Sequence, residues 1–147
     1  MLELRHFTRQ DAAFLQASLY PGIAMEEALR LIEAWDTCVN QNRYFEMFAV
    51  TCDSAPIGCA SLFEHSPSVV SAGIEIITSE QNKGYGAQAM AKLIDLARQK
   101  GYRIMLDQLR RDNRASVRLH EKLGFESDGY IYRNQKNQET LLYIKPL

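Results

Sequence analysis

The feature that most constrains this chain is the segment Gln81-Asn82-Lys83-Gly84-Tyr85-Gly86, which lies between a strand-like run and an amphipathic helix pattern. Two glycines separated by one residue at the start of a helix allow bare backbone N–H groups to approach an anion. A second cluster follows about one strand–helix unit later and contains Asn113, Ala115, Ser116 and the run Leu119-His120-Glu121-Lys122-Leu123-Gly124-Phe125. The first segment alone predicts a phosphate-binding turn, which requires a strand, a loop and a helix N-terminus in that order.

The composition excludes several classes of function. The chain has 147 residues, of which 46% are hydrophobic and 24% charged, so we expect a single domain over residues 1–147 with an ordinary apolar core. The net charge of −1 gives no indication of nucleic acid or a membrane as partner, and no apolar run approaches the length of a membrane span. Residues 1–5 lack the apolar stretch of a signal peptide, which favours a cytoplasmic location.

The numbers and positions of the cysteines and histidines argue against disulfide bonds and a metal site. The three cysteines, Cys38, Cys52 and Cys59, are odd in number and not closely paired, which is untypical of a disulfide framework. The three histidines are far apart along the chain and show no metal-ligand spacing with the cysteines. We therefore expect reduced thiols and no metal site.

Hydrophobic periodicity predicts an α/β fold with a mixed sheet. The expected strands are residues 2–7, 44–51, 57–64, 69–78, 102–109, 125–132 and 140–144, and the expected helices are residues 8–21, 24–40, the segment from the glycine loop to residue 100, and a short helix from residue 113 that ends before residue 124. The order is β-α-α-β-β-β-α-β-α-β-β, in which antiparallel hairpins flank one βαβ crossover. The fourth strand has an apolar face that we expect in the core, formed by Val70, Ala72, Ile74 and Ile76.

A dinucleotide-binding site is the competing interpretation of the glycine loop. Residues 84–89 match G-x-G-x-x-A, and Asp107 lies where a Rossmann fold would carry its ribose-binding acid. Against this, several residues separate the strand from Gly84, the strand is the fourth in the chain, and only one βαβ unit is present. A Walker loop is excluded because no G-K-[ST] follows.

Together, the two clusters and the order of elements resemble the GNAT acyl-CoA N-acyltransferase superfamily over essentially the whole chain. The family's loop motif [QR]-x-x-G-x-[GA] is filled by Gln81, Gly84 and Gly86, and the second cluster matches the family's Leu-Tyr-Glu-Lys-x-Gly-Phe-like run. The resemblance implies a GNAT-like sheet whose fourth and fifth strands splay apart to form an acyl-CoA cleft. It also implies acetyl-CoA as co-substrate, without a metal.

The same resemblance implies a set of residues that contact coenzyme A. These are Ile76, Ile77 and Thr78 through the strand backbone, Gln81, Asn82, Lys83, Gly84, Tyr85, Gly86 and Ala87 in the loop, and Asn113 and Ser116 across the cleft. A helix N-terminus with exposed N–H groups suits the pyrophosphate. Asn113 has a second interpretation as a helix N-cap, Ser116 one as a capping residue, and Lys83 one as a solvated lysine.

Two residues are candidates for proton transfer. Glu75, just before the loop, is in a position where family members often carry a carboxylate and is the candidate general base, acting through a water; the alternative is a solvent-facing strand glutamate. His120 occupies the place of the family's tyrosine, so it is the candidate acid or hydrogen-bond donor toward the thiolate. The alternative for His120 is a helix-surface histidine.

The predicted function is acetyl transfer from acetyl-CoA to a primary amine of a small molecule. A protein N-terminus or lysine is the alternative acceptor, and a non-catalytic acyl-CoA-binding module is the alternative from another class. We expect the acceptor pocket between the first two helices and the last hairpin, near the aromatic residues Tyr20, Trp35, Tyr44, Phe45 and Phe48. The sequence names no particular amine and leaves a homodimer open.

Overall fold

The computed structural model describes residues 1–147 as a mixed α/β fold. The strands are β1 (Leu2–Arg5), β2 (Val39–Asn40), β3 (Arg43–Cys52), β4 (Ala55–Ser66), β5 (Val69–Ile76), β6 (Ile104–Arg110), β7 (Tyr132–Arg133) and β8 (Glu139–Pro146). The helices are α1 (Ala12–Phe14), α2 (Met25–Trp35), α3 (Tyr85–Gln99) and α4 (Arg114–Lys122), with short irregular turns on both sides of α1. None of these helices has the length and apolar character that crossing a membrane requires.

The strands form one sheet in the order β1-β3-β4-β5-β6-β8-β7, and the short β2 pairs with the first two residues of β3, Arg43 and Tyr44. All neighbours in the sheet are antiparallel except β5 and β6, which are joined by α3 and run parallel. The predicted single βαβ crossover between antiparallel hairpins is therefore confirmed.

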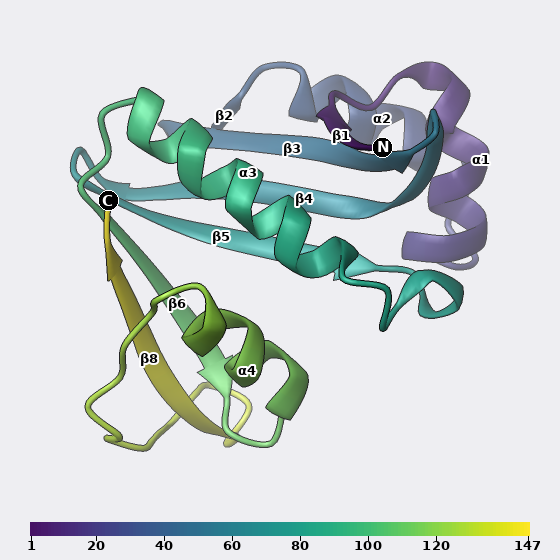
Figure 1. Ribbon diagram of the computed structural model, residues 1–147. Helices are drawn as coiled ribbons and strands as arrows, with labels where there is room; N and C mark the ends of the chain where they lie inside the picture. The colour runs from purple at the N-terminus through teal and green to yellow at the C-terminus, as the bar shows by residue number, and fades with distance from the viewer.

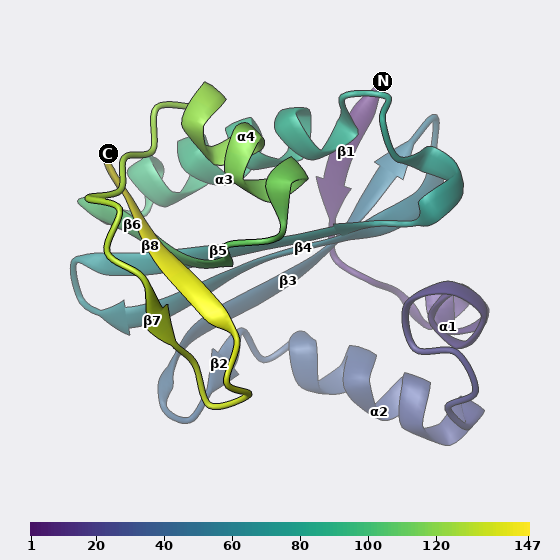
Figure 2. The same cartoon turned by 90° about the horizontal axis from the view of Figure 1, so that it is seen from below.

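Helices cover both faces of the sheet. In Figure 2, α3 and α4 lie on one face and α1 and α2 on the other. The larger apolar core lies under α3, because Met90, Leu93, Ile94 and Ala97 recur at helical spacing and are all buried against the sheet. A smaller core, with Ala28 and Ile32 of α2, fills the opposite face.

The parallel strands β5 and β6 separate almost at once. Only Val69↔Ile104 and Val70↔Met105 are paired, and Figure 1 shows the two strands diverging from that point. Beyond these two pairs, side-chain hydrogen bonds replace the backbone hydrogen bonds between the strands. Asp107 Oδ1 accepts the N–H of Ala72 at 2.9 Å, and the Ser71 hydroxyl donates to the carbonyl of Leu106. The expected splay of the fourth and fifth long strands is confirmed, and polar side chains close its apex.

Two expected elements are wrong in part. The helix expected over residues 24–40 ends at Trp35, because Cys38 adopts φ +54° and the chain then pairs with β3 as β2. The strand expected over residues 125–132 is reduced to one bridge, Glu126↔Ile144, and the start of β7. A local turn interrupts it, in which Gly129 (φ +81°) donates its N–H to the Ser127 hydroxyl.

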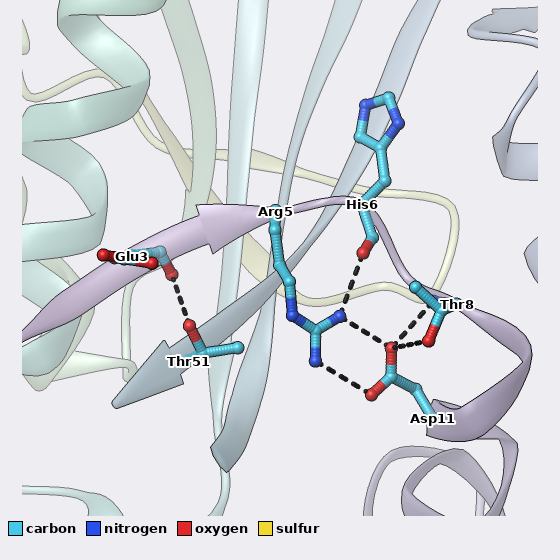
Figure 3. A network of polar contacts seen from close by, with 6 residues as sticks. All are labelled: Glu3, Arg5, His6, Thr8, Asp11 and Thr51. Atoms are coloured by element: carbon cyan, nitrogen blue, oxygen red, sulfur yellow. Dashed lines mark hydrogen bonds and ion pairs between the residues drawn. The ribbon is translucent and has the colours of Figure 1, made fainter. Parts of the chain in front are cut away.

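An ion pair between the half-buried Arg5 and the buried Asp11 fixes the chain where β1 passes into the first helical turn (Figure 3). Both guanidinium nitrogens of Arg5 donate to Asp11, at 2.7 and 3.0 Å, and the carboxylate also accepts the N–H of Thr8 at 2.7 Å. This last bond is one of the two contacts of a capping box, in which an acid three residues on accepts the N–H of the N-cap residue. On the neighbouring strand pair, Thr51 donates to the carbonyl of Glu3. Because Asp11 is only 5% exposed, its charge depends on these donors.

Candidate active site

A cleft of about 720 Å³ opens where β5 and β6 diverge. Residues of β4, β5, β6, α3 and α4 line it, namely Phe63, His65, Ser71, Ala72, Gly73, Ile74, Glu75, Ile76, Gln81, Gly86, Met90, Asp107, Gln108, Leu109, Arg110, Asn113, Ala115, Ser116, Leu119 and His120. The lining comes from both faces of the sheet, because the side chains of each strand alternate between them. The cleft therefore offers one approach beside α3 and α4 and another from the face that carries α2.

One wall of the cleft is the free edge of β5. The N–H of Ile77 donates to Ile57 at 2.9 Å, so the odd-numbered residues here pair with β4. By the alternation of the ladder, Ala72, Ile74 and Ile76 turn their backbone groups toward β6, which has already diverged. Such an edge can hydrogen-bond an extended, amide-rich ligand.

The face of β5 that was expected in the core is only partly buried. Val70 and Ile76 are buried, whereas Ala72 and Ile74 are half-buried because they line the cleft. The register also divides the three residues expected to offer backbone groups. Ile76 faces the opened edge, the N–H of Ile77 is engaged by β4, and Thr78 begins a 3₁₀ turn.

The glycine loop leads into α3 with a concave backbone. Asn82 (φ +63°) and Gly84 (φ +85°) both adopt left-handed conformations, and Gly84 is the N-cap of α3. The first-turn N–H groups after Gly84 have no partner within the helix, which is the arrangement that binds anions. Eight residues separate Ile76 from Tyr85, so the turn is not the tight one of a dinucleotide fold.

Only part of the predicted loop set reaches the cleft wall. Gln81 and Gly86 line it, and Gln81 Nε2 donates to the carbonyl of Ile76 at 2.8 Å. Lys83 is exposed and ion-paired with Glu80 at 3.0 Å. The hydroxyl of Tyr85 accepts from the thiol of Cys52 and its ring packs beside the larger core. The remaining loop residues expected at coenzyme A, which do not line the cleft, are Asn82, Gly84 and Ala87.

The second cluster forms the opposite wall through α4. Asn113 is its N-cap, since Oδ1 accepts the N–H of Ser116 at 3.2 Å, and both residues line the cleft. The capping role expected as one alternative for Asn113 is confirmed. Ser116 receives the cap instead of supplying it, which leaves its hydroxyl free for other contacts.

His120 is not a helix-surface residue, as one alternative held; it is 4% exposed. Its Nε2 lies 2.7 Å from Oδ2 of Asp107, which is 3% exposed, and its Nδ1 lies 2.8 Å from the carbonyl oxygen of Ser116. The ring also packs edge-on against Phe125, with centroids 4.7 Å apart. Both ring nitrogens are thus engaged within the protein.

Glu75 is exposed and lines the cleft on the face of the sheet opposite α3. It pairs in register with Cys59 of β4. Burial and the neighbouring charge of Glu75 raise the pKa of the Cys59 thiol to about 12. This thiol therefore stays protonated at neutral pH, which leaves the carboxylate as the basic group at this point of the cleft.

Residues distant in sequence also gather outside the cleft. His6, Cys38 and Glu46 place ligand-type atoms within 4.8 Å of one another, a proximity that their spacing in the sequence did not indicate. Glu46 accepts from Tyr44 and contacts His6 Nε2 at 2.6 Å, and Lys100 lies 3.7 Å away. The Glu46 carboxylate therefore already has hydrogen-bond and ion-pair partners within the protein.

The expected cluster of aromatic acceptor residues does not form. Trp35 packs against both Phe7 and Tyr20 on the α2 face, Phe45 packs against Phe63, and Tyr44 stacks on Tyr102. Phe48 is buried in the core under α3. Their common position in the first half of the sequence was a poor guide, because alternate residues of one strand face opposite sides of a sheet.

Sequence reasoning missed the place of Asp107 in this cleft. It was considered only as a ribose-binding acid, whereas its carboxylate joins β5 to His120. The available signal was a lone acid at an otherwise apolar position of β6, between the buried residues Met105 and Leu109. A buried carboxylate requires partners, and that requirement could have directed attention to it.

Comparison with known proteins identifies the family. The sequence profile of the acetyltransferase (GNAT) family matches residues 10–125, well over half of the chain. The chain therefore belongs to the GNAT family, as its two motifs indicated.

Individual relatives are more distant. An L-methionine sulfoximine/L-methionine sulfone acetyltransferase of Pseudomonas paraeruginosa is 29% identical over 104 residues, 67% of this chain and 60% of that protein. Among solved structures, the ribosomal L7/L12 α-N-protein acetyltransferase RimL in complex with coenzyme A has a TM-score of 0.80 at 19% identity, covering 99% of this chain and 94% of that one. The microcin C7 self-immunity acetyltransferase MccE, in complex with acetyl-CoA and AMP, has a TM-score of 0.79 at 17% identity, covering 99% and 92%. The likeness to these structures shows a shared fold.

Proposed function

We propose that this protein is an acetyl-CoA-dependent N-acetyltransferase that transfers the acetyl group directly to a primary amine of a small molecule. The observation that carries the proposal is the cleft between β5 and β6, with a free strand edge along one wall and the glycine loop at the start of α3. Membership of the GNAT family supports the activity, and the similar proteins named above are acetyltransferases.

The cleft and the glycine loop at its end fit coenzyme A in two ways. The loop from Asn82 to Ala87 offers unpaired N–H groups and the positive end of a 15-residue helix to the pyrophosphate. The free edge of β5, at Ile74 and Ile76, suits the amides of the pantetheine arm, with Asn113 on the opposite wall. Gln81 donates a hydrogen bond to the Ile76 carbonyl and so fixes the position of the last residue of β5, which forms this wall.

The amine would approach from the α2 face, where Glu75 is exposed. An alkyl ammonium has a pKa near ~10 in water, so it must lose a proton before it attacks. Glu75 would accept this proton through a water. N–H groups of the β5 edge would stabilise the negative charge that develops on the thioester carbonyl oxygen. His120 would be the source of the proton that the leaving thiolate takes up, passed on through a neighbouring group because both of its ring nitrogens are engaged.

The acceptor side carries groups that suit a small polar amine. Gln108 and Arg110 line the cleft on the same face of the sheet as Glu75. Gln108 also borders a second hollow, of about 640 Å³, whose lining is mostly polar. The relative from P. paraeruginosa is named for two amino-acid analogues, which favours small molecules over proteins as acceptors.

The test combines binding and turnover. Thermal unfolding is measured with acetyl-CoA and with NAD, and thiol release from acetyl-CoA is followed across a panel of amino acids, methionine sulfone, methionine sulfoximine, polyamines and N-terminal peptides. We expect stabilisation by acetyl-CoA alone and turnover with a small amine. Turnover restricted to peptides would favour the protein acetyltransferase alternative. Binding without turnover on any amine would favour a non-catalytic acyl-CoA-binding module, and stabilisation by NAD alone would refute the proposal.

The role of Glu75 has its own control. Glu75→Gln should lower kcat by about 10²-fold, the usual contribution of a general base. The same exchange at Glu80, which pairs with Lys83 outside the cleft lining, should leave kcat unchanged. Equal kcat values for wild type and Glu75→Gln would exclude Glu75 as the base.

A further inference from the structure

His120 and Asp107 form a buried pair at the floor of the cleft. Their side chains are 5% and 3% exposed, and Nε2 of His120 lies 2.7 Å from Oδ2 of Asp107. The ring is enclosed by Phe125 and by Tyr143 of β8, whose hydroxyl donates to Glu121 at 2.9 Å. Burial and the neighbouring Glu121 raise the pKa of Tyr143, so this hydroxyl remains neutral, and Asp107 is the charged group in direct contact with the ring.

The hydrogen-bond partners fix the protons on the ring. Nδ1 faces the carbonyl oxygen of Ser116 at 2.8 Å, and a carbonyl can only accept, so Nδ1 carries a hydrogen. Oδ1 of Asp107 accepts the N–H of Ala72, which favours the ionised carboxylate. With Asp107 ionised, Nε2 also donates, to Oδ2, and the pair consists of an imidazolium and a carboxylate.

The same contacts leave His120 no free N–H to point into the cleft. The nearest group that can carry a proton onward is the hydroxyl of Ser116, whose Oγ lies 3.5 Å from Nδ1. Ser116 is half-buried on the cleft wall, and its hydroxyl has no capping duty because Asn113 caps the helix. Asp107, His120 and Ser116 thus lie in a line from the apex of the splay to the cleft.

We propose that these three residues form a proton relay in which Ser116 delivers the proton to the thiolate that leaves coenzyme A. The proposal rests on the proposed acetyltransferase function. As the carbon–sulfur bond breaks, sulfur keeps the electron pair and takes the proton of the Ser116 hydroxyl. The serine oxygen takes the Nδ1 proton, and His120 is left neutral with its Nε2–H still bonded to Asp107. The nitrogen of the attacking amine loses one proton as the amide forms, and this proton returns to Nδ1 of His120 through solvent, so charge and protons balance.

In this relay Ser116 is the catalytic residue, and His120 and Asp107 act through it. Ser116→Ala should lower kcat by about 10²-fold while the KM for acetyl-CoA changes little, because the lost group acts on the leaving atom. Ser116→Thr keeps a hydroxyl at the same position and should restore most of kcat. A residue that merely packs against the ligand would instead raise KM, and threonine would not rescue it.

Asp107→Asn changes the proton on His120 at nearly constant shape. The amide oxygen can still accept from Ala72, which turns the amide NH₂ toward Nε2 and forces that nitrogen to accept. The ring is then neutral with one hydrogen, on Nδ1. The alkaline limb of the kcat profile should move to lower pH in Asp107→Asn, whereas removal of a structural contact alone would lower kcat equally at every pH.

Nitrogen-15 NMR of the imidazole rings tests the charged pair without turnover. The His120 signal is assigned by its loss in His120→Gln, and at pH 7 both ring nitrogens should be protonated in the wild type and one in Asp107→Asn. A neutral ring in the wild type overturns the relay, as does wild-type kcat in Ser116→Ala. Absence of transfer from acetyl-CoA to every amine of the panel refutes the proposed function and the relay together. Transfer at the wild-type rate without the Ser116 hydroxyl refutes the relay alone.

Discussion

Gly58 is the position at which one added carbon should cost this fold most. A Cβ built there lies 2.1 Å from the carbonyl oxygen of Glu75 and 3.0 Å from the Cα of Ile76, both on β5. Ordinary van der Waals contact begins at 3.4 Å, so β4 and β5 would have to move apart by about 1.3 Å. The obstacle is backbone, which cannot rotate away, and it belongs to the strand that forms the cleft wall.

We expect Gly58→Ala to lose about 3 kcal/mol of unfolding free energy, at the upper end of overpacking costs. With a urea m-value of roughly 2 kcal/mol/M, the unfolding midpoint should fall by roughly 1.5 M. Affinity for acetyl-CoA should fall as well, because Ile76 shifts with Glu75. Urea denaturation followed by circular dichroism and calorimetric titration with acetyl-CoA measure the two effects.

Gly73→Ala is the matched control on the same strand pair. Its Cβ meets only the hydroxyl of Ser61, at 2.9 Å, and a serine side chain can rotate away. Its cost should stay below about 1 kcal/mol, because a less flexible unfolded chain offsets the small clash. If Gly58→Ala unfolds within about 0.5 kcal/mol of the wild type, or if Gly73→Ala is the more damaging of the two, the steric argument is refuted.

Three further predictions concern the cap, the core and the loop. Burial raises the pKa of the Asp11 carboxyl, but hydrogen bonds from the Arg5 guanidinium and the Thr8 N–H outweigh it and lower the pKa overall. The ionised carboxylate therefore stabilises the fold fully above the pKa of the unfolded chain, and this stabilisation is lost as pH falls through the lower pKa of the folded state. Asp11→Asn should therefore cost about 2 kcal/mol at pH 7 and less at pH 3 in urea titrations; an equal cost at both pH values would contradict this. Leu93→Ala should cost about 3 kcal/mol because the side chain is fully buried under α3, whereas the exposed neighbour Lys92→Ala should stay within about 0.5 kcal/mol in thermal unfolding. Gly84→Ala and Gly101→Ala both place alanine at a positive φ in open space and should each cost about 1 kcal/mol, but only Gly84→Ala should weaken acetyl-CoA binding; equal affinities would exclude the loop from the site.

Most of the framework could be predicted from the sequence because it depends on local signals. The stripe Met90, Leu93, Ile94 and Ala97 specifies one face of α3, and Gly101 ends the helix with a positive φ. The glycine loop and the run after Asn113 carry the family identity. Each of these features involves residues within a turn or two of one another, so their physics is contained in a short stretch of chain.

Interruptions of that framework were harder to predict. Residues 125–132 look like a strand by composition, but a turn held by Ser127 and Gly129 limits the pairing to the bridge at Glu126 and the start of β7. Likewise, the second helix stops at Trp35 because the following residues pair with β3 instead. In both places a local pattern competed with contacts that are distant in the chain, and the distant contacts prevailed.

The sequence by itself determined the family, the order of the principal elements and the wall of the cleft formed by the glycine loop. Only the tertiary structure decided what His120 does there. Its partner Asp107 lies 13 residues away and is itself held by Ala72, 35 residues further back. The protons of a buried imidazole are set by whichever acceptors the fold brings to its two nitrogens, and those acceptors meet only once β5 and β6 have diverged.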